Sequence, residues 1–116
     1  MPRFVLGIAF VLIASLSGPA FGATAPLEDA LSEKVMGDPN APVTIIEYAS
    51  LSCSHCKAFH RDSLPKIKKE YIDTGKVKLI YRDFPLGSLA LAGSMLARCA
   101  GTLKFFGMVD ALFKAQ

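Results

Sequence analysis

Cys53-Ser54-His55-Cys56 places two thiols three residues apart, a spacing at which a pair of cysteines can open and close a disulfide. The run before it, Val43–Ala49, is rich in β-branched residues and predicts a buried strand. The run after it, Lys57–Arg61, contains no glycine or proline and predicts a helix. The pair is therefore expected where a strand meets a helix. A helix start leaves backbone N–H groups unpaired and carries a partial positive charge, and both favour a thiolate over a thiol.

The position of each cysteine in this motif predicts its role. An ordinary thiol has a pKa of about 8.5 and is mostly protonated at neutral pH. A lower pKa at the helix start would make Cys53 a thiolate and a good leaving group, which makes the disulfide more oxidising. We therefore expect Cys53 to be the nucleophile and Cys56 the resolving cysteine. A purely structural bridge is disfavoured, because so short a loop stabilises a fold by only about 2 kcal/mol.

Two neighbouring side chains are candidates for tuning this pair. His55 lies between the cysteines and is expected to stabilise the Cys53 thiolate by a hydrogen bond or by positive charge. Glu47 is a carboxylate in an otherwise apolar strand, six residues before Cys53. It is either a buried proton acceptor near Cys56 or a charge at a strand edge in water.

A metal site is the main alternative for the same residues. His60 follows Cys56 by four residues, so Cys53, Cys56 and His60 together suggest zinc. The sequence offers no second CxxC and no obvious fourth ligand, so we expect His60 to be a surface histidine and the protein to hold no metal or cofactor. Haem attachment is excluded because position 57 is lysine. Cys99, in a helix of small and apolar residues, is expected to be buried and inert.

The first 25 residues have the layout of a secretory signal peptide. Arg3 precedes a run of about 13 mostly apolar residues, and small residues and helix breakers follow. That run is shorter than the roughly 20 residues needed to span a bilayer. We expect export, with cleavage after Gly22 or after Ala25, which leaves about 90 residues for one domain.

The rest of the chain predicts an α/β order. Residues 26–42 are polar and turn-rich, and the domain is expected to begin at residue 43. A helix from Ser54 to about Tyr71, kinked near Pro65, leads to a second strand, Val77–Phe84, that should pair in parallel with the first. Two helices follow from about residue 88, separated by Gly101. The first is expected to bury a broad apolar face, formed by Leu89, Leu91, Ala92, Met95, Leu96 and Cys99.

The charged residues point away from nucleic acid. The formal net charge is +3, and the lysines of residues 66–78 alternate with acidic residues, as on a solvated face. No dense basic run or aromatic platform is present, so we expect no nucleic-acid binding.

Four segments together carry a family resemblance. They are Asp38-Pro39-Asn40-Ala41-Pro42-Val43, Glu47-Tyr48-Ala49-Ser50, the Cys-x-His-Cys centre and Tyr81-Arg82-Asp83-Phe84-Pro85-Leu86. Over about residues 37–113 the chain resembles the exported DsbA-like thiol–disulfide oxidoreductases of the thioredoxin superfamily. The resemblance implies a thioredoxin-like fold with an inserted helical subdomain. It also implies disulfide introduction into reduced exported polypeptides in the periplasm, and re-oxidation by a membrane quinone-linked partner. By motif match, Cys53 is the nucleophile, Cys56 the resolving cysteine, His55 the thiolate stabiliser and Glu47 the buried acid.

The chain departs from the family pattern in two places. Ser54 stands where family members commonly have proline, so the redox potential is expected to differ. The family also has a cis-proline loop and further strands after the inserted helices, whereas Pro85 is the last proline here. We therefore expect an N-terminal fragment, truncated before the C-terminal strands. The alternatives are a reductase or isomerase, a Cys/His zinc-binding module, or an inactive fragment.

Overall fold

The computed structural model describes residues 23–116, so the predicted signal segment up to residue 22 lies outside the described residues. Within residues 23–116, three strands form one sheet in the order β1-β3-β2, with β1 at Lys34–Met36, β2 at Val43–Ala49 and β3 at Val77–Asp83. β2 and β3 run parallel, from Val43 opposite Val77 to Ala49 opposite Asp83, and β1 pairs antiparallel with β3. The predicted strand–helix–strand unit and its parallel pairing are confirmed.

A long helical stretch connects β2 to β3. It consists of α2 (Ser54–Ala58), the π-helical segment η1 (Phe59–Ser63), α3 (Leu64–Ile67) and a second π-helical segment, η2 (Lys68–Ile72). The predicted kink near Pro65 takes the form of η1. Proline has no N–H to donate and its ring crowds the carbonyl one turn earlier, and in η1 the N–H of Leu64 reaches back five residues to Phe59.

The π turns also change which residues face the sheet. Leu64, Ile67 and Tyr71 stand at i, i+3 and i+7, the α-helical spacing of one face turned to the sheet, but Tyr71 is 46% exposed and Ile72 is buried in its place. A π turn closes over one more residue than an α turn, so the residue that reaches the sheet is one position later than α-helical spacing predicts.

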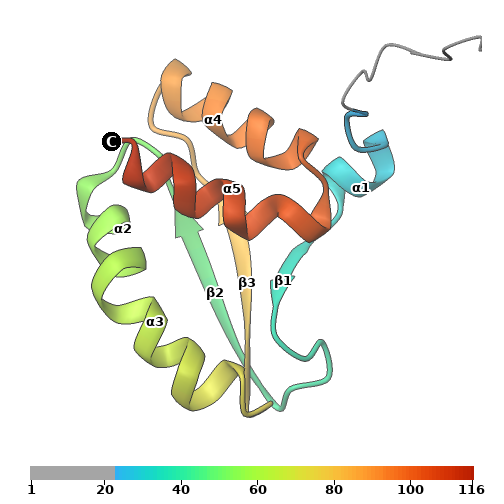
Figure 1. The fold of residues 1–116 in the computed structure, drawn as a ribbon, viewed down its shortest axis with the longest axis vertical. Helices are drawn as coiled ribbons and strands as arrows, with labels where there is room; N and C mark the ends of the chain where they lie inside the picture. The colour runs from blue at the N-terminus through green and yellow to red at the C-terminus, as the bar shows by residue number, and fades with distance from the viewer. Residues whose placement is uncertain (1–22) are drawn as a thin grey trace, which may run out of the picture.

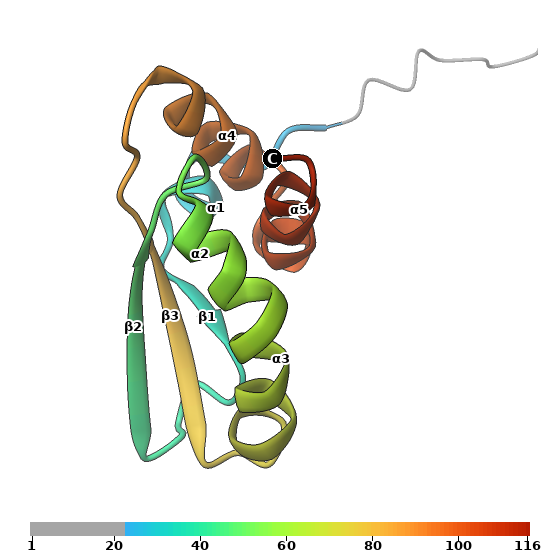
Figure 2. The ribbon, with the colours of Figure 1, turned by 90° about the vertical axis from the view of Figure 1, so that its left-hand side faces the viewer.

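Two helices complete the described chain, α4 (Ser88–Cys99) and α5 (Thr102–Lys114), as the sequence predicts. Figures 1 and 2 show α4 beside the carboxyl ends of β2 and β3, and α5 on the side of the sheet that α2 and α3 also cover. α5 buries Phe105, Val109 and Phe113. α4 contradicts its predicted orientation, because it buries Ala90, Ser94 and Ala97 while its large apolar side chains are exposed. Small side chains allow closer approach to neighbouring elements, and this face packs against α5 and α1.

Only one face of the sheet is covered by the described residues. Leu79 and Tyr81 of β3 point into the core and are almost fully buried. On the opposite face, Ile46 and Tyr48 of β2 are 44% and 60% exposed. The prediction that β2 is a buried strand is therefore wrong for one of its two faces. β2 lies at the sheet edge, and no described element covers its outer side.

Residues 26–42 are more than the polar lead-in that the sequence predicts, because they contain α1 (Leu27–Leu31) and β1. Lys34 of β1 is fully buried, and its Nζ donates to the Asp29 carbonyl at 2.6 Å, to Ser32 Oγ at 3.1 Å and to Thr102 Oγ1 at 2.8 Å. This segment therefore joins the sheet to the start of α5. Among residues 23–116, no helix has the length and apolar character needed to cross a membrane.

Candidate redox site

The two cysteines lie where the loop after β2 meets the start of α2, as predicted. Cys53 is the N-cap of α2, with φ −93° and ψ 118°, and its carbonyl accepts the N–H of Lys57 at 3.0 Å. The N–H of Cys56 points at the Cys53 sulfur, 3.5 Å away. The preceding loop is held by Ser50, whose carbonyl accepts the N–H of Cys53 at 3.0 Å and whose Oγ accepts the N–H of Leu86 at 3.1 Å.

This geometry gives the two thiols opposite electrostatic environments. Hydrogen bonds from the backbone and thiol of Cys56, and from the backbone of His55, lower the pKa of Cys53 below its ordinary value. Burial raises the pKa of Cys56, and the neighbouring Cys53 and Glu47 charges raise it further. The division into an attacking thiol, Cys53, and a resolving thiol, Cys56, remains a prediction, and this asymmetry is the electrostatic feature that such a division requires.

His55 contributes through its backbone rather than its ring. His55 is exposed, and within the described part of the chain no hydrogen bond connects its imidazole to Cys53. Its predicted role as a side-chain stabiliser of the thiolate remains a prediction.

Glu47 and His60 form a buried pair. His60 Nε2 lies 2.9 Å from Glu47 Oε1 and 3.1 Å from Oε2, and the two side chains are 6% and 11% exposed respectively. Of the two interpretations of Glu47, the charge at a strand edge in water is therefore wrong. The expectation that His60 lies on the surface is also wrong. Its position one helical turn after Cys56, on the side of the helix that faces the sheet, was the signal that the sequence offered.

A second ion pair lies at the carboxyl end of β3. Arg98 Nε donates to Asp83 Oδ2 at 2.6 Å, and Arg98 Nη1 donates to the carbonyls of Ala30 and Ser32. Burial and the Asp83 charge raise the pKa of Tyr81. The sequence analysis missed the pairing of Arg98 with Asp83, although Asp83 stands in one of the segments that carry the family resemblance.

The structure does not support a metal site at the cysteines. The Nε2 atom of His60 lies against both carboxylate oxygens of Glu47, so this nitrogen is not free to bind a metal beside the cysteines. Within residues 23–116, no three His, Cys, Asp or Glu side chains are grouped as ligands of a metal ion. Cys99 is exposed rather than buried, because it lies outside the small-residue face of α4.

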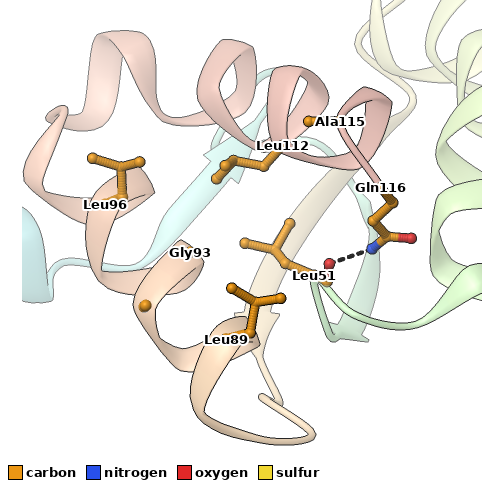
Figure 3. Close-up of a pocket in the computed structure, with 8 residues that line it drawn as sticks. Leu51, Leu89, Gly93, Leu96, Leu112, Ala115 and Gln116 are labelled. Carbon is orange, nitrogen blue, oxygen red and sulfur yellow. Dashed lines mark hydrogen bonds between the residues drawn. The ribbon is translucent and has the colours of Figure 1, made fainter.

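An apolar groove of about 350 Å³ lies beside the loop that carries the cysteines. Figure 3 shows Leu51 between Leu89 of α4 and Leu112 of α5, with the Gln116 amide donating to the Leu51 carbonyl. Gly93 lets α4 pack closely against Leu51, since a Cβ at position 93 would lie only 3.0 Å from Leu51 Cδ1. Leu51, which lines the groove, stands two residues before Cys53 in the sequence.

The chain is similar to known proteins over most of its described residues. A family model described as thioredoxin matches residues 29–116. A Rickettsia bellii protein named as a candidate protein-disulfide oxidoreductase is 34% identical over 86 residues, which are 73% of this chain and 33% of that protein.

The chain also resembles several solved structures, two of which are DsbA-like proteins. Wolbachia pipientis α-DsbA1 matches with a TM-score of 0.68 at 46% identity, over 73% of this chain and 43% of that one. Oxidised BdbD of Bacillus subtilis matches with a TM-score of 0.65 at 28% identity, over 81% of this chain and 51% of that one. The chain thus spans between a third and a half of the length of these relatives.

These matches confirm the thioredoxin-like α/β fold predicted from the sequence. The family match extends over the sheet, the helical stretch between β2 and β3, and the two helices after β3. The chain belongs to the thioredoxin family and, within it, to the DsbA-like proteins.

Proposed function

We propose that the protein exchanges disulfides with exported polypeptides through Cys53 and Cys56, and that it acts as an oxidase. The single observation that supports this most strongly is the asymmetry of the thiols. The pKa of Cys53 is lowered at a helix start, whereas that of Cys56 is raised beneath it.

The oxidising reaction begins with the Cys53–Cys56 disulfide. A substrate thiolate attacks the Cys53 sulfur, the bond between the two cysteines breaks, and Cys56 leaves as a thiolate that takes up a proton. A second substrate thiolate then attacks the substrate sulfur bound to Cys53, and Cys53 leaves as a thiolate. The substrate gains a disulfide and loses two electrons, which the protein gains as a dithiol. A stable Cys53 thiolate favours this direction, because a thiol of lower pKa is the better leaving group.

The surroundings of Cys53 suit a polypeptide substrate. The sulfur is half-buried at the end of a helix, and the apolar groove at Leu51 lies beside the same loop. Localisation and re-oxidation follow from the family: we propose that the protein works in the periplasm after removal of a signal peptide, and that a membrane quinone-linked protein re-oxidises it. His55 is proposed to assist the Cys53 thiolate.

The function is tested by the reduction potential of the purified protein, equilibrated with glutathione buffers of known ratio. We expect a value nearer the roughly −120 mV of DsbA than the roughly −270 mV of thioredoxin. A value below about −250 mV would instead indicate a reductase. Cys53→Ser and Cys56→Ser serve as controls, since neither can form the disulfide.

A second measurement tests the activity itself. The oxidised protein is mixed with a reduced peptide that contains two cysteines, and loss of peptide thiols is followed by mass spectrometry. One peptide disulfide should form for each protein disulfide consumed. No transfer from a folded, oxidised sample would favour the inactive-fragment alternative.

A further inference from the structure

The Glu47–His60 pair lies between the sheet and the helices, directly behind the resolving cysteine. Glu47 points inward from β2 opposite Tyr81, and His60 enters the same layer from η1. Glu47 and Cys56 line one open cavity of about 410 Å³, together with His55 and Phe59. This volume is large enough for water, which occupies about 30 Å³ per molecule, so water can carry a proton between Cys56 and Glu47.

We infer that His60 is a positioning residue: by binding both carboxylate oxygens it holds the Glu47 carboxylate in place as the proton acceptor for Cys56. This inference rests on the proposed exchange function and names a residue that sequence analysis had placed on the surface. His60 touches neither substrate nor the reacting sulfurs in this role. It acts through Glu47.

The packing around His60 fixes its ring in the orientation that this role requires. The ring centroid lies 4.5 Å from that of Phe113 and 6.1 Å from that of Tyr81, and the Phe59 ring meets its edge at 5.8 Å. Aromatic contacts on several sides leave the ring little freedom to turn away from Glu47. A carboxylate left without a partner at this depth would be much less stable in its charged form.

Several other charged or titratable groups face the pair, and none of them replaces His60. On the helical stretch between β2 and β3 these groups are Cys56, His55, Lys57, Arg61 and Lys68. On β3 the group is Tyr81, and on α5 the groups are Asp110 and Lys114. Among the described residues, hydrogen bonds to the Glu47 carboxylate come from His60 alone. Removing His60 therefore leaves Glu47 buried without a partner.

A proton acceptor is needed when Cys56 resolves a mixed disulfide, because the Cys56 thiol must lose its proton to attack. The Cys56 thiol gives its proton to Glu47, and the Cys56 sulfur attacks Cys53. The bond between Cys53 and the bound thiol breaks, and that thiol leaves as a thiolate. Cys56 is oxidised and the leaving group is reduced, so no further oxidant is required. In the oxidising direction the same proton returns from Glu47 to Cys56.

The test uses the protein with a mixed disulfide between Cys53 and glutathione, in a Cys99→Ser background so that only the pair reacts. Release of glutathione is measured from pH 5 to 9. His60→Phe keeps the aromatic packing and removes the bond to Glu47, whereas His60→Gln keeps a polar contact. We expect His60→Phe to slow release about tenfold at pH 6–7 and to move the acid limb of the profile to higher pH, with partial recovery in His60→Gln.

A double variant separates positioning from packing. Glu47→Gln should slow release at least as much as His60→Phe, and the two together should be no slower than Glu47→Gln alone. Asp110→Asn, which removes a charge that faces His60 from α5, should leave the profile unchanged.

Full additivity of His60→Phe and Glu47→Gln would overturn the inference, as would an unchanged pH profile in a folded His60→Phe variant. If the unsubstituted protein fails to release glutathione at all, the proposed exchange function fails instead, so the two failures are distinguishable.

Discussion

The two faces of the sheet are built from alternate residues of the same strands, yet helices cover one face and no described element covers the other. Glu47 points into the layer beneath the helices and binds His60, whereas Tyr48, its neighbour in sequence, is 60% exposed on the other side. Tyr48 accepts a hydrogen bond from Arg82, and Arg82 pairs with Glu33 in solvent. The chemistry of this fold therefore depends on the covered face, because burial is what couples Glu47, His60 and Cys56 to one another.

The largest expected effect concerns packing. Leu79 on the covered face is fully buried, and Leu79→Ala should lower the free energy of unfolding by about 2–5 kcal/mol. Ile46→Ala, the matched truncation on the open face, should cost less than about 1 kcal/mol. Urea denaturation of both variants measures the comparison. Equal losses would mean that the open face of the sheet is covered in solution.

The next contrast is between two arginine ion pairs. Arg98 and Asp83 are 25% and 14% exposed, whereas Arg82 and Glu33 are 43% and 49% exposed. Arg98→Gln should destabilise the fold by about 2–3 kcal/mol because it leaves a largely buried carboxylate unpaired. Arg82→Gln should change stability by less than about 0.5 kcal/mol. Thermal unfolding in low and high salt checks this, and comparable losses in both variants would contradict it.

The third contrast is between the two thiols, whose pKa values are shifted in opposite directions. The pKa of Cys53 is lowered, so its thiolate persists to lower pH, whereas the raised pKa of Cys56 delays its ionisation as pH increases. At pH 7, Cys53 should react with iodoacetamide at least about ten times faster than Cys56. Quenched alkylation of Cys53→Ser and Cys56→Ser, each with Cys99→Ser, gives both rates. If the alkylation rate of Cys56 reached its plateau at a lower pH than that of Cys53, the roles assigned to the two thiols would be reversed.

The smallest expected effect concerns two tyrosines. Within residues 23–116, the buried Tyr81 hydroxyl has no hydrogen-bond partner. Tyr81→Phe should therefore leave stability unchanged or raise it by up to about 1 kcal/mol, since an unpaired buried polar group is removed. Tyr48→Phe removes an exposed hydrogen bond to Arg82 and should cost no more than about 0.5 kcal/mol. Guanidinium unfolding resolves the difference, and a clear loss in Tyr81→Phe would indicate an ordered water at that hydroxyl.

The sequence predicts the local elements well because their signals are local. The β-branched run Val43–Ala49, the CxxC and the break at Gly101 before α5 are each recognisable within a few residues. What it misses depends on contacts between distant residues. β1 has only three residues and is stabilised by pairing with β3 and by the buried Lys34, which binds Thr102 of α5. Hydrophobicity likewise gives the wrong inner face for α4, because close packing there selects alanine and serine over leucine.

The Glu47–His60 pair shows the same limit within the site. Each residue is identifiable as a candidate, but thirteen positions separate them and no pattern connects them. Their contact depends on the register of β2 against β3 and on the helical path through η1. Only the fold brings the carboxylate and the imidazole together behind Cys56.

The π turn at Phe59–Ser63 has a consequence for how this chain tolerates changes in length. An α-helix advances about 100° per residue, so a deletion in an ordinary helix turns everything downstream to a new face. A π turn holds about one residue more than an α turn. One residue can therefore be lost from 59–63 while Leu64 and Ile72 keep facing the sheet. The imidazole of His60 has no such freedom. The segment can therefore lose one residue without loss of the fold, whereas a change that removes or displaces His60 leaves Glu47 without its partner.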